Sequence, residues 1–387
     1  MTEEAVRPLE LDPLERAAGV TLGDADGPGQ PSQRYATARA ALESVMAREL
    51  ARGQCFVSFS GGRDSSAVLA VATSVARREG LGLPIPVTFR FPDVPTSQEN
   101  QWQEQVIEHL GLTQWERMDL SDELDLLGDT ARLCLEAHGP TWPANAYLHM
   151  PIFEVARGGV VMTGLDGDGL FGDWRWCHAQ AVLHRQVPFH PRDLARIGAA
   201  WAPTSVRRRL IRRRGFFTPP WLTGPARDEY EARLVDRQAQ EPRRWDRRTR
   251  WHGRSRALAV TMASLDALGA PLDVGVVHPL LDSAVLDALA TEGGAAGFGD
   301  RTSAMRHLCG DLLPARVVER RSKAVFGGAV WREQARTFVA QWDGTGVDLD
   351  RVDPQRLRES WQAEHPVFHS WSLLHQAWLA QHRLQEK

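Results

Sequence analysis

Lysine is almost absent from this sequence of 387 residues, although basic residues are plentiful. Of its 46 lysine and arginine residues, only Lys323 and Lys387 are lysine, so an internal lysine is unusual here. The 49 acidic residues outweigh the basic ones and leave a formal net charge of −3. A chain with this balance has no global attraction for nucleic acid or for anionic lipid.

Cysteines and long apolar runs are also scarce. The four cysteines lie far apart and form no CxxC pair, which argues against a disulfide framework or a zinc site. The first residues read MTEEAVRPLELDPLE and lack the apolar segment of a signal peptide. No stretch approaches the ~18 consecutive apolar residues of a membrane helix. We therefore expect a cytoplasmic protein with no membrane partner.

Strand and helix patterns alternate from residue 35 to about residue 170. Short apolar runs predict strands at 55–59, 85–91, 115–120 and 159–164. Helical spacing predicts helices at 35–52, 64–78, 98–110, 126–137 and 147–157. This alternation is typical of an α/β fold with a parallel sheet and flanking helices. Residues 1–34 are rich in proline, glycine and aspartate, and we expect a flexible tail there.

The pattern changes after Asp173. Strand-like runs become rare, and residues 201–260 contain 16 arginines against 6 acidic residues. Helical spacing returns at 256–268, 283–290 and 360–384. We predict one domain over residues 35–387, with an α/β core at 35–173 and a mainly helical part at 174–387.

A phosphate-binding loop, Ser60–Ser66 (SGGRDSS), joins the first predicted strand to the next helix. Gly61 and Gly62 allow the backbone N–H groups to approach an anion, and the helix start adds its positive dipole end. Hydroxyls of Ser60, Ser65 and Ser66 are further donors, and Ser58 precedes them on the strand. Asp64 fits among phosphate ligands only if Mg²⁺ lies between the negative charges. The loop is not a Walker loop, because GxxxxGK[ST] is absent.

The loop resembles the signature of the PP-loop ATP pyrophosphatases, which cleave ATP between the α and β phosphates. The segment Thr163–Gly172 (TGLDGDGLFG) is similar to a block of asparagine synthetases and β-lactam synthetases. That resemblance implies the adenine nucleotide α-hydrolase-like fold and a nucleotide-binding role for the α/β core. It also implies Asp168 as a second Mg²⁺ ligand beside Asp64, and backbone contacts from Gly164 to ATP.

Three later or smaller segments extend the resemblance. Leu313–Phe326 is similar to the family's LPxxVxxRxxK segment, which implies that Lys323 stabilises negative charge on the pyrophosphate and on the oxyanion. His278–Asp282 matches a PLLD segment, and Glu99 stands where the family has an acidic residue. Phe89 ends the second predicted strand and would line the adenine pocket.

Two departures separate this chain from the glutamine-dependent asparagine synthetases. Residue 2 is Thr2, and fewer than 60 residues precede the loop, so we expect no glutaminase domain in this chain. Leu165 replaces the family's catalytic glutamate or tyrosine; Asp166 or another residue such as Glu154 could take over its role, and the sequence does not choose between them. Gly169 replaces an acidic residue beside the magnesium ligand.

The sequence favours an AMP-forming amide ligase that takes a small-molecule or peptide carboxylate and an amine or ammonia. The ammonia could come from a separate glutaminase, or a peptide-binding partner could deliver the substrate. Alternatives are a lactam or lasso-peptide cyclase of the same family, a PP-loop enzyme of tRNA modification, and a member that has lost its chemistry. The negative net charge disfavours nucleic acid. The arginines at 205–256 either hold an acidic substrate or coat solvated helices.

Overall fold

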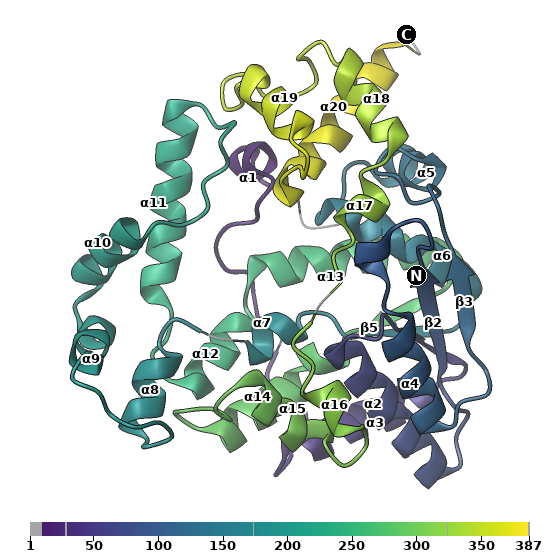
Figure 1. The fold of residues 1–387 in the computed structure, drawn as a ribbon, viewed down its shortest axis with the longest axis vertical. Coiled ribbons are helices and arrows are strands. Elements are labelled where there is room, and N and C mark those ends of the chain that lie inside the picture. The colour runs from purple at the N-terminus through teal and green to yellow at the C-terminus, as the bar shows by residue number, and fades with distance from the viewer. Residues whose placement is uncertain (1–9, 28, 173, 323, 386–387) are drawn as a thin grey trace.

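The computed structural model describes residues 10–27, 29–172, 174–322 and 324–385. Its centre is a parallel sheet with the strand order β3-β2-β1-β4-β5 (Figure 1). The strands are β1 (Cys55–Ser58), β2 (Ile85–Arg90), β3 (Glu116–Asp119), β4 (Val160–Thr163) and β5 (Gly275–Val277). Helices cover both faces of the sheet, which confirms the α/β fold with a mainly helical second half.

The strand order reverses at β1. From β1 the chain adds β2 and β3 on one side, and then returns to add β4 and β5 on the other. Ser58 at the end of β1 is in register with Thr163 at the end of β4. The loops after these two strands therefore leave the sheet side by side, at the point where such sheets bind ligands.

Successive residues of β1 face two different cores. Val57 packs in the core formed with α2 (Ala38–Leu50), α3 (Arg63–Glu79), α4 (Asn100–Leu110), α14 (Ser283–Gly293), α15 (Arg301–Cys309) and α16 (Ala315–Val318). Phe56 packs in the core on the opposite face. That core includes α5 (Asp129–His138), α6 (Met150–Val155), α13 (Arg256–Gly269), α17 (Gly327–Val330), α18 (Glu333–Gln341), α19 (Pro354–Gln362) and α20 (Trp371–Gln385). The period of two along the strand produces this division.

Three features of the fold differ from the sequence prediction. The strand β5 was not predicted, because three residues are too few for a recognisable pattern. The predicted helix at 147–157 begins as a 3₁₀ turn over Ala144–His149. The predicted helix at 360–384 is two helices, α19 and α20, and Pro366 lies in the connection between them.

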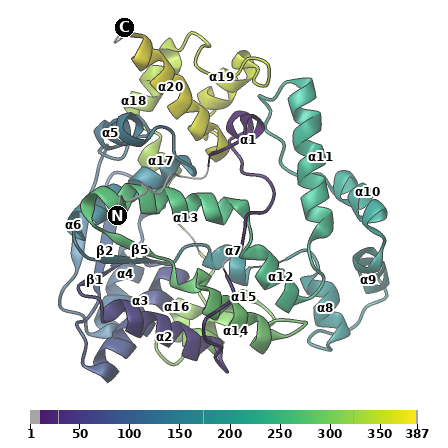
Figure 2. The ribbon, with the colours of Figure 1, turned by 180° about the vertical axis from the view of Figure 1, so that it is seen from behind.

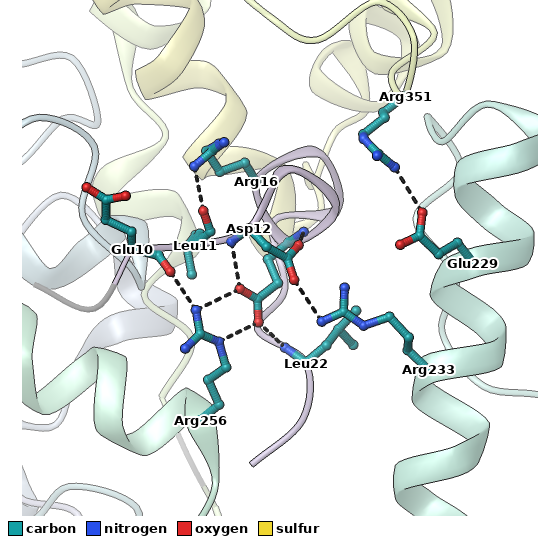
Figure 3. Close-up of polar contacts among 10 residues, drawn as sticks. Glu10, Leu11, Asp12, Arg16, Leu22, Glu229, Arg233, Arg256 and Arg351 are labelled. Carbon is teal, nitrogen blue, oxygen red and sulfur yellow. Dashed lines mark hydrogen bonds and ion pairs between the residues drawn. The ribbon is translucent and has the colours of Figure 1, made fainter. Parts of the chain in front are cut away.

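One segment of the predicted tail, residues 12–22, is packed against the rest of the protein. Residues Pro13–Ala18 form α1, in which Leu14 is 1% exposed. Asp12 caps this helix and also pairs with Arg233 at 2.8 Å (Figure 3). The buried Glu15 carboxylate accepts hydrogen bonds from the Arg256 guanidinium at 2.8 and 3.0 Å. The expectation of a flexible tail is therefore wrong for this segment.

Four helices form an arm beside the sheet domain. They are α8 (Cys177–Leu183), α9 (Asp193–Trp201), α10 (Thr204–Arg214) and α11 (Gly224–Gln240). Figures 1 and 2 show them along the edge of the molecule opposite β2 and β3. Two short helices, α7 (Gly167–Phe171) and α12 (Trp245–His252), lie between the arm and the sheet. The pair Asp12–Arg233 and a Glu229–Arg351 pair of 3.0 Å tie α11 to α1 and to the segment before α19 (Figure 3).

Candidate active site

A cavity of about 510 Å³ opens where the chain leaves β1 and β4. Eight of the residues predicted to bind ATP or metal or to act in catalysis line it: Ser58, Ser60, Gly62, Asp64, Ser65, Gly164, Asp166 and Asp168. Leu165 and Arg301 line it as well. The alignment of β1 with β4 explains this gathering, because segments 100 residues apart in the chain leave the same edge of the sheet.

The phosphate-binding loop contains a glycine, Gly61, that a residue with a side chain could replace only with strain. Gly61 has φ +82°, and a Cβ there would meet the Gln103 side chain at 2.9 Å. Gly62 precedes α3, and no side chain caps that helix, so its first N–H groups are open to an anion. The Ser60 and Ser65 hydroxyls lie 3.2 Å apart, and Ser65 donates to the Gly62 carbonyl at 3.2 Å.

Glycines also bring the second loop against α3. A Cβ on Gly164 would lie 2.6 Å from the Ser65 nitrogen, and one on Gly167 would lie 2.2 Å from the Asp64 carboxyl carbon. Neither position has room for a side chain. The glycines of the TGLDGDG segment therefore let the loop after β4 touch the start of α3.

Arg301 joins the two aspartates that the resemblance assigns to magnesium. Its guanidinium donates to the Asp64 carboxylate at 2.6 Å and pairs with Asp168. Burial raises the pKa of Asp64 above its usual value of 3.8, although the Arg301 charge opposes this rise. Sequence reasoning missed Arg301, which lies outside the quoted motifs at the first position of α15.

The carboxylates fit a magnesium ion that is shared with phosphate. Within the described ranges, no group of three or more His, Cys, Asp or Glu residues could hold a metal. However, Mg²⁺ commonly takes one or two carboxylates and completes its shell with water and substrate phosphates. The buried Asp64 Oδ1 atom has no hydrogen-bond partner in the described chain and is available as a ligand.

A buried ion pair fixes the late segment against the phosphate-binding loop. Arg320 pairs through both terminal nitrogens with Glu99, and its guanidinium also donates to the Gly61 carbonyl at 3.1 Å. Glu99 also accepts from the Ala324 N–H at 2.9 Å. Both side chains are 5% exposed. The family's acidic position thus has a structural partner, which the sequence did not reveal. Lys323 lies outside the described residues.

Asp166 faces the cavity with a histidine behind it. Its carboxylate is hydrogen-bonded to Nε2 of His252, the last residue of α12. Asp166 has φ +61°, a left-handed conformation that is uncommon for residues other than glycine. Gly169 makes room for this carboxylate, since a Cβ there would lie 2.4 Å from Asp166 Oδ1. Leu165 adds an apolar wall beside this pair.

Several predicted residues are not among those lining the cavity. Gly61 and Ser66 belong to the loop, and Ser66 is fully buried with no hydrogen bond to its hydroxyl in the described part. Phe89 packs edge-on against Phe91, with ring centres 6.4 Å apart. Glu154 is exposed on α6. Asp166 is therefore better placed than Glu154 for a catalytic role.

One histidine lines the cavity, and a second contacts its lining residue Thr163. His278 lies 2.7 Å from the Thr163 hydroxyl, and burial lowers its pKa to about 4. His149 lines the cavity, and burial lowers its pKa as well. Both imidazoles are therefore neutral near pH 7 and add no charge to the site.

Comparison with known proteins gives one result. The family model described as asparagine synthase matches residues 37–382. No curated protein matches the chain. None of the helices in the described ranges is long and apolar enough to cross a membrane.

Proposed function

Because this chain belongs to the asparagine synthase family of ATP-dependent amide ligases, we propose that it activates a carboxylate as its adenylate and transfers the acyl group to an amine. The observation that carries the proposal is the meeting of Asp64 and Asp168 in one cavity, at the uncapped start of α3. Two acidic residues at an anion-binding helix end are suited to a nucleotide that carries a divalent cation.

ATP is a substrate in the proposed first step. A carboxylate oxygen of the acid attacks the α-phosphorus, the bond to the β-phosphate oxygen breaks, and pyrophosphate leaves. The Ser60 and Ser65 hydroxyls and the open N–H groups of α3 hold the pyrophosphate. Mg²⁺ held by Asp64 and Asp168 would neutralise phosphate charge. Arg301, which pairs with both carboxylates, would supply a further positive charge for the phosphates of a bound nucleotide.

In the proposed second step an amine attacks the acyl carbon, and AMP leaves with the electron pair of the acyl–oxygen bond. The amine must lose a proton, and the Leu165 side chain cannot accept one. Asp166 is the carboxylate that faces the cavity at the neighbouring position, and His252 holds it in place. We assign proton acceptance to Asp166 and oxyanion stabilisation to Lys323.

Exchange of labelled pyrophosphate into ATP, measured with a panel of carboxylic acids that includes aspartate, tests the first step. Asp64→Asn and Asp168→Asn should abolish acid-dependent exchange, and Lys323→Ala should slow it by about 10²-fold. Asp228→Asn, an exposed position on α11, is the matched control and should retain full exchange. Full exchange in Asp64→Asn would refute the mechanism. If none of the acids in the panel supports exchange, and the protein binds tRNA tightly with an affinity that falls as salt is added, tRNA modification would be favoured.

A further inference from the structure

The arm carries a second concave surface, outside the catalytic cavity. A cavity of about 290 Å³ lies between α10 and the connection from α11 to α12. Four arginines and an indole line it: Arg207, Arg243, Arg244, Arg247 and Trp201. We call this feature the arm cavity.

Aromatic rings support two of these guanidinium groups. Arg243 lies over the ring of Trp201 at 5.4 Å, and Arg207 lies over Trp176 at 6.0 Å. A guanidinium that stacks on an indole face keeps the N–H groups along its edge available for a carboxylate or a phosphate. In the described chain, the Arg243 guanidinium makes no hydrogen bond or ion pair, and Arg207 Nε is buried without a partner.

Acidic residues of the chain do not balance this charge. Asp246 pairs with Arg244 at 2.8 Å, and Glu241, which also lines the cavity, pairs with Arg175 at 3.5 Å and with Arg248 at 4.0 Å. Arg207, Arg243 and Arg247 have no carboxylate partner among the described residues. Burial and the charge of Arg243 lower the pKa of Arg207, as expected for like charges that are held together. An external anion would relieve this repulsion.

Apolar side chains are exposed on the three helices that contribute Gln180, Trp201 and Arg207 to the arm cavity, and we call these apolar residues the apolar rim. Large hydrophobic residues are exposed on three consecutive helices of the arm and on the loop between two of them: Leu183 at 47%, Phe189 at 55%, Leu194 at 65%, Trp201 at 47% and Val206 at 44%. Helix α9 contacts both α8 and α10, so these helices form one surface (Figures 1 and 2). Exposed apolar side chains around a charged pocket are typical of a protein or peptide interface, and a free small anion would not need them.

Helix α12 connects the arm cavity with the catalytic cavity. Arg247 lines the first, Arg248 donates to the Gly169 and Leu170 carbonyls of α7 at 2.6 and 3.1 Å, and His252 holds Asp166. Along the helix axis, Arg247 and His252 are separated by about 7.5 Å. Two or three residues of an extended peptide span that distance along the axis.

We propose that the arm cavity and its apolar rim bind an acidic peptide segment with apolar side chains, and that this segment belongs to the carboxylate substrate. This inference rests on the proposed function and names its substrate class. Carboxylates of the segment bind Arg207 and Arg243, while its apolar side chains cover the exposed residues of α8 to α10. The reacting carboxylate then lies on the side of α12 that carries His252.

Fluorescence anisotropy without ATP tests the binding directly. The probe is a fluorescein-labelled 12-residue peptide in which glutamate alternates with leucine and phenylalanine. The double variant Arg207→Gln/Arg243→Gln should raise Kd at least tenfold, which corresponds to about 1.4 kcal/mol. The matched control Arg209→Gln/Arg213→Gln removes the same charge from α10 outside the arm cavity, and should change Kd less than threefold. Arg243→Lys keeps the charge but not the planar group, and should recover only part of the affinity.

Four other outcomes of this experiment would contradict the proposal. Equal weakening in both double variants would show attraction by charge alone. Equal affinity for a polyglutamate peptide would remove the role of the apolar rim. Tighter binding of a single-stranded RNA of matched charge would indicate a nucleic-acid surface. Absence of peptide binding by the folded wild-type protein would refute the docking while leaving pyrophosphate exchange untouched, so the two proposals fail separately.

Discussion

Replacing Arg301 by methionine tests the electrostatics of the site. The variant keeps the length of the side chain and removes the charge between Asp64 and Asp168. Breaking a fully buried ion pair costs about 3–5 kcal/mol. The Asp64 side chain is 15% exposed but that of Asp168 is 44% exposed, which reduces the cost. We expect a loss of about 3 kcal/mol in the free energy of unfolding without Mg²⁺, at the low end of that range.

Magnesium should compensate for this loss in the variant. Without the guanidinium, the two carboxylates repel each other and attract a divalent cation more strongly. At 100 times its Kd, Mg²⁺ stabilises a protein by about 2.7 kcal/mol. In the wild-type protein without nucleotide, Mg²⁺ must displace Arg301, so its effect should be smaller. Urea unfolding at pH 7 with and without saturating MgCl₂ measures both quantities.

Arg306→Met is the matched control on the same helix. Arg306 pairs with Glu319 at the surface, where both side chains are about half exposed, and such pairs contribute at most about 1 kcal/mol. Its stability and its response to Mg²⁺ should resemble those of the wild-type protein. An Arg301→Met protein with wild-type stability and a wild-type magnesium response would refute the assignment of Asp64 and Asp168 to a cation site.

Magnesium binding at Asp64 and Asp168 should also depend on pH. The pKa of Asp64 is raised above 3.8 by burial, so in the folded state its carboxylate gains a proton at a higher pH than in the unfolded chain. Cation binding needs the charged form and should therefore weaken as pH falls toward this raised pKa. In the Arg301→Met variant the opposing charge is gone, so the weakening should begin at a higher pH. Isothermal titration with MgCl₂ across the acidic range measures the pH at which magnesium binding weakens in each of the two proteins, and this pH should be higher for Arg301→Met.

Three further changes probe one buried histidine of the core and two residues that fix the site. His375 is buried, and burial lowers its pKa to about 4, below the usual 6.5. Protonation of this residue should therefore lower the free energy of unfolding by about 2 kcal/mol from pH 7 to pH 5. In urea unfolding, His375→Gln should lack this part of the pH dependence. Glu99→Gln should cost about 3–5 kcal/mol because it leaves Arg320 buried without its counter-charge, whereas Glu99→Leu combined with Arg320→Met should cost less. His252→Asn should slow amide formation by up to about 10²-fold and shift its pH profile, with pyrophosphate exchange unchanged, if it positions Asp166. Equal loss of both half-reactions would assign His252 a structural role only.

Local patterns in the sequence predicted four of the five strands and the loops at the edge of the sheet. The apolar runs around Val57 and Val161 predicted buried strands, and the glycines of both loops predicted close backbone approach. These features depend on neighbours within about ten residues, so composition and spacing reveal them. The loop motifs placed Asp64 and Asp168 after two strands of one parallel sheet, and the structure shows that these strands are neighbours.

Which charged side chains pair with one another could be seen only in the tertiary structure. Arg301 is 237 residues from Asp64, and His252 is 86 residues from Asp166, so no local pattern connects them. Arg320 and Glu99 are also far apart in the chain, and no local pattern connects them. Helix α1 lies in a segment whose proline- and glycine-rich composition predicted a flexible tail. The sequence by itself predicted which backbone segments are suited to bind phosphate. Only the packing of distant helices decided which charges meet there, because Coulomb energy depends on distance in space and not on separation along the chain.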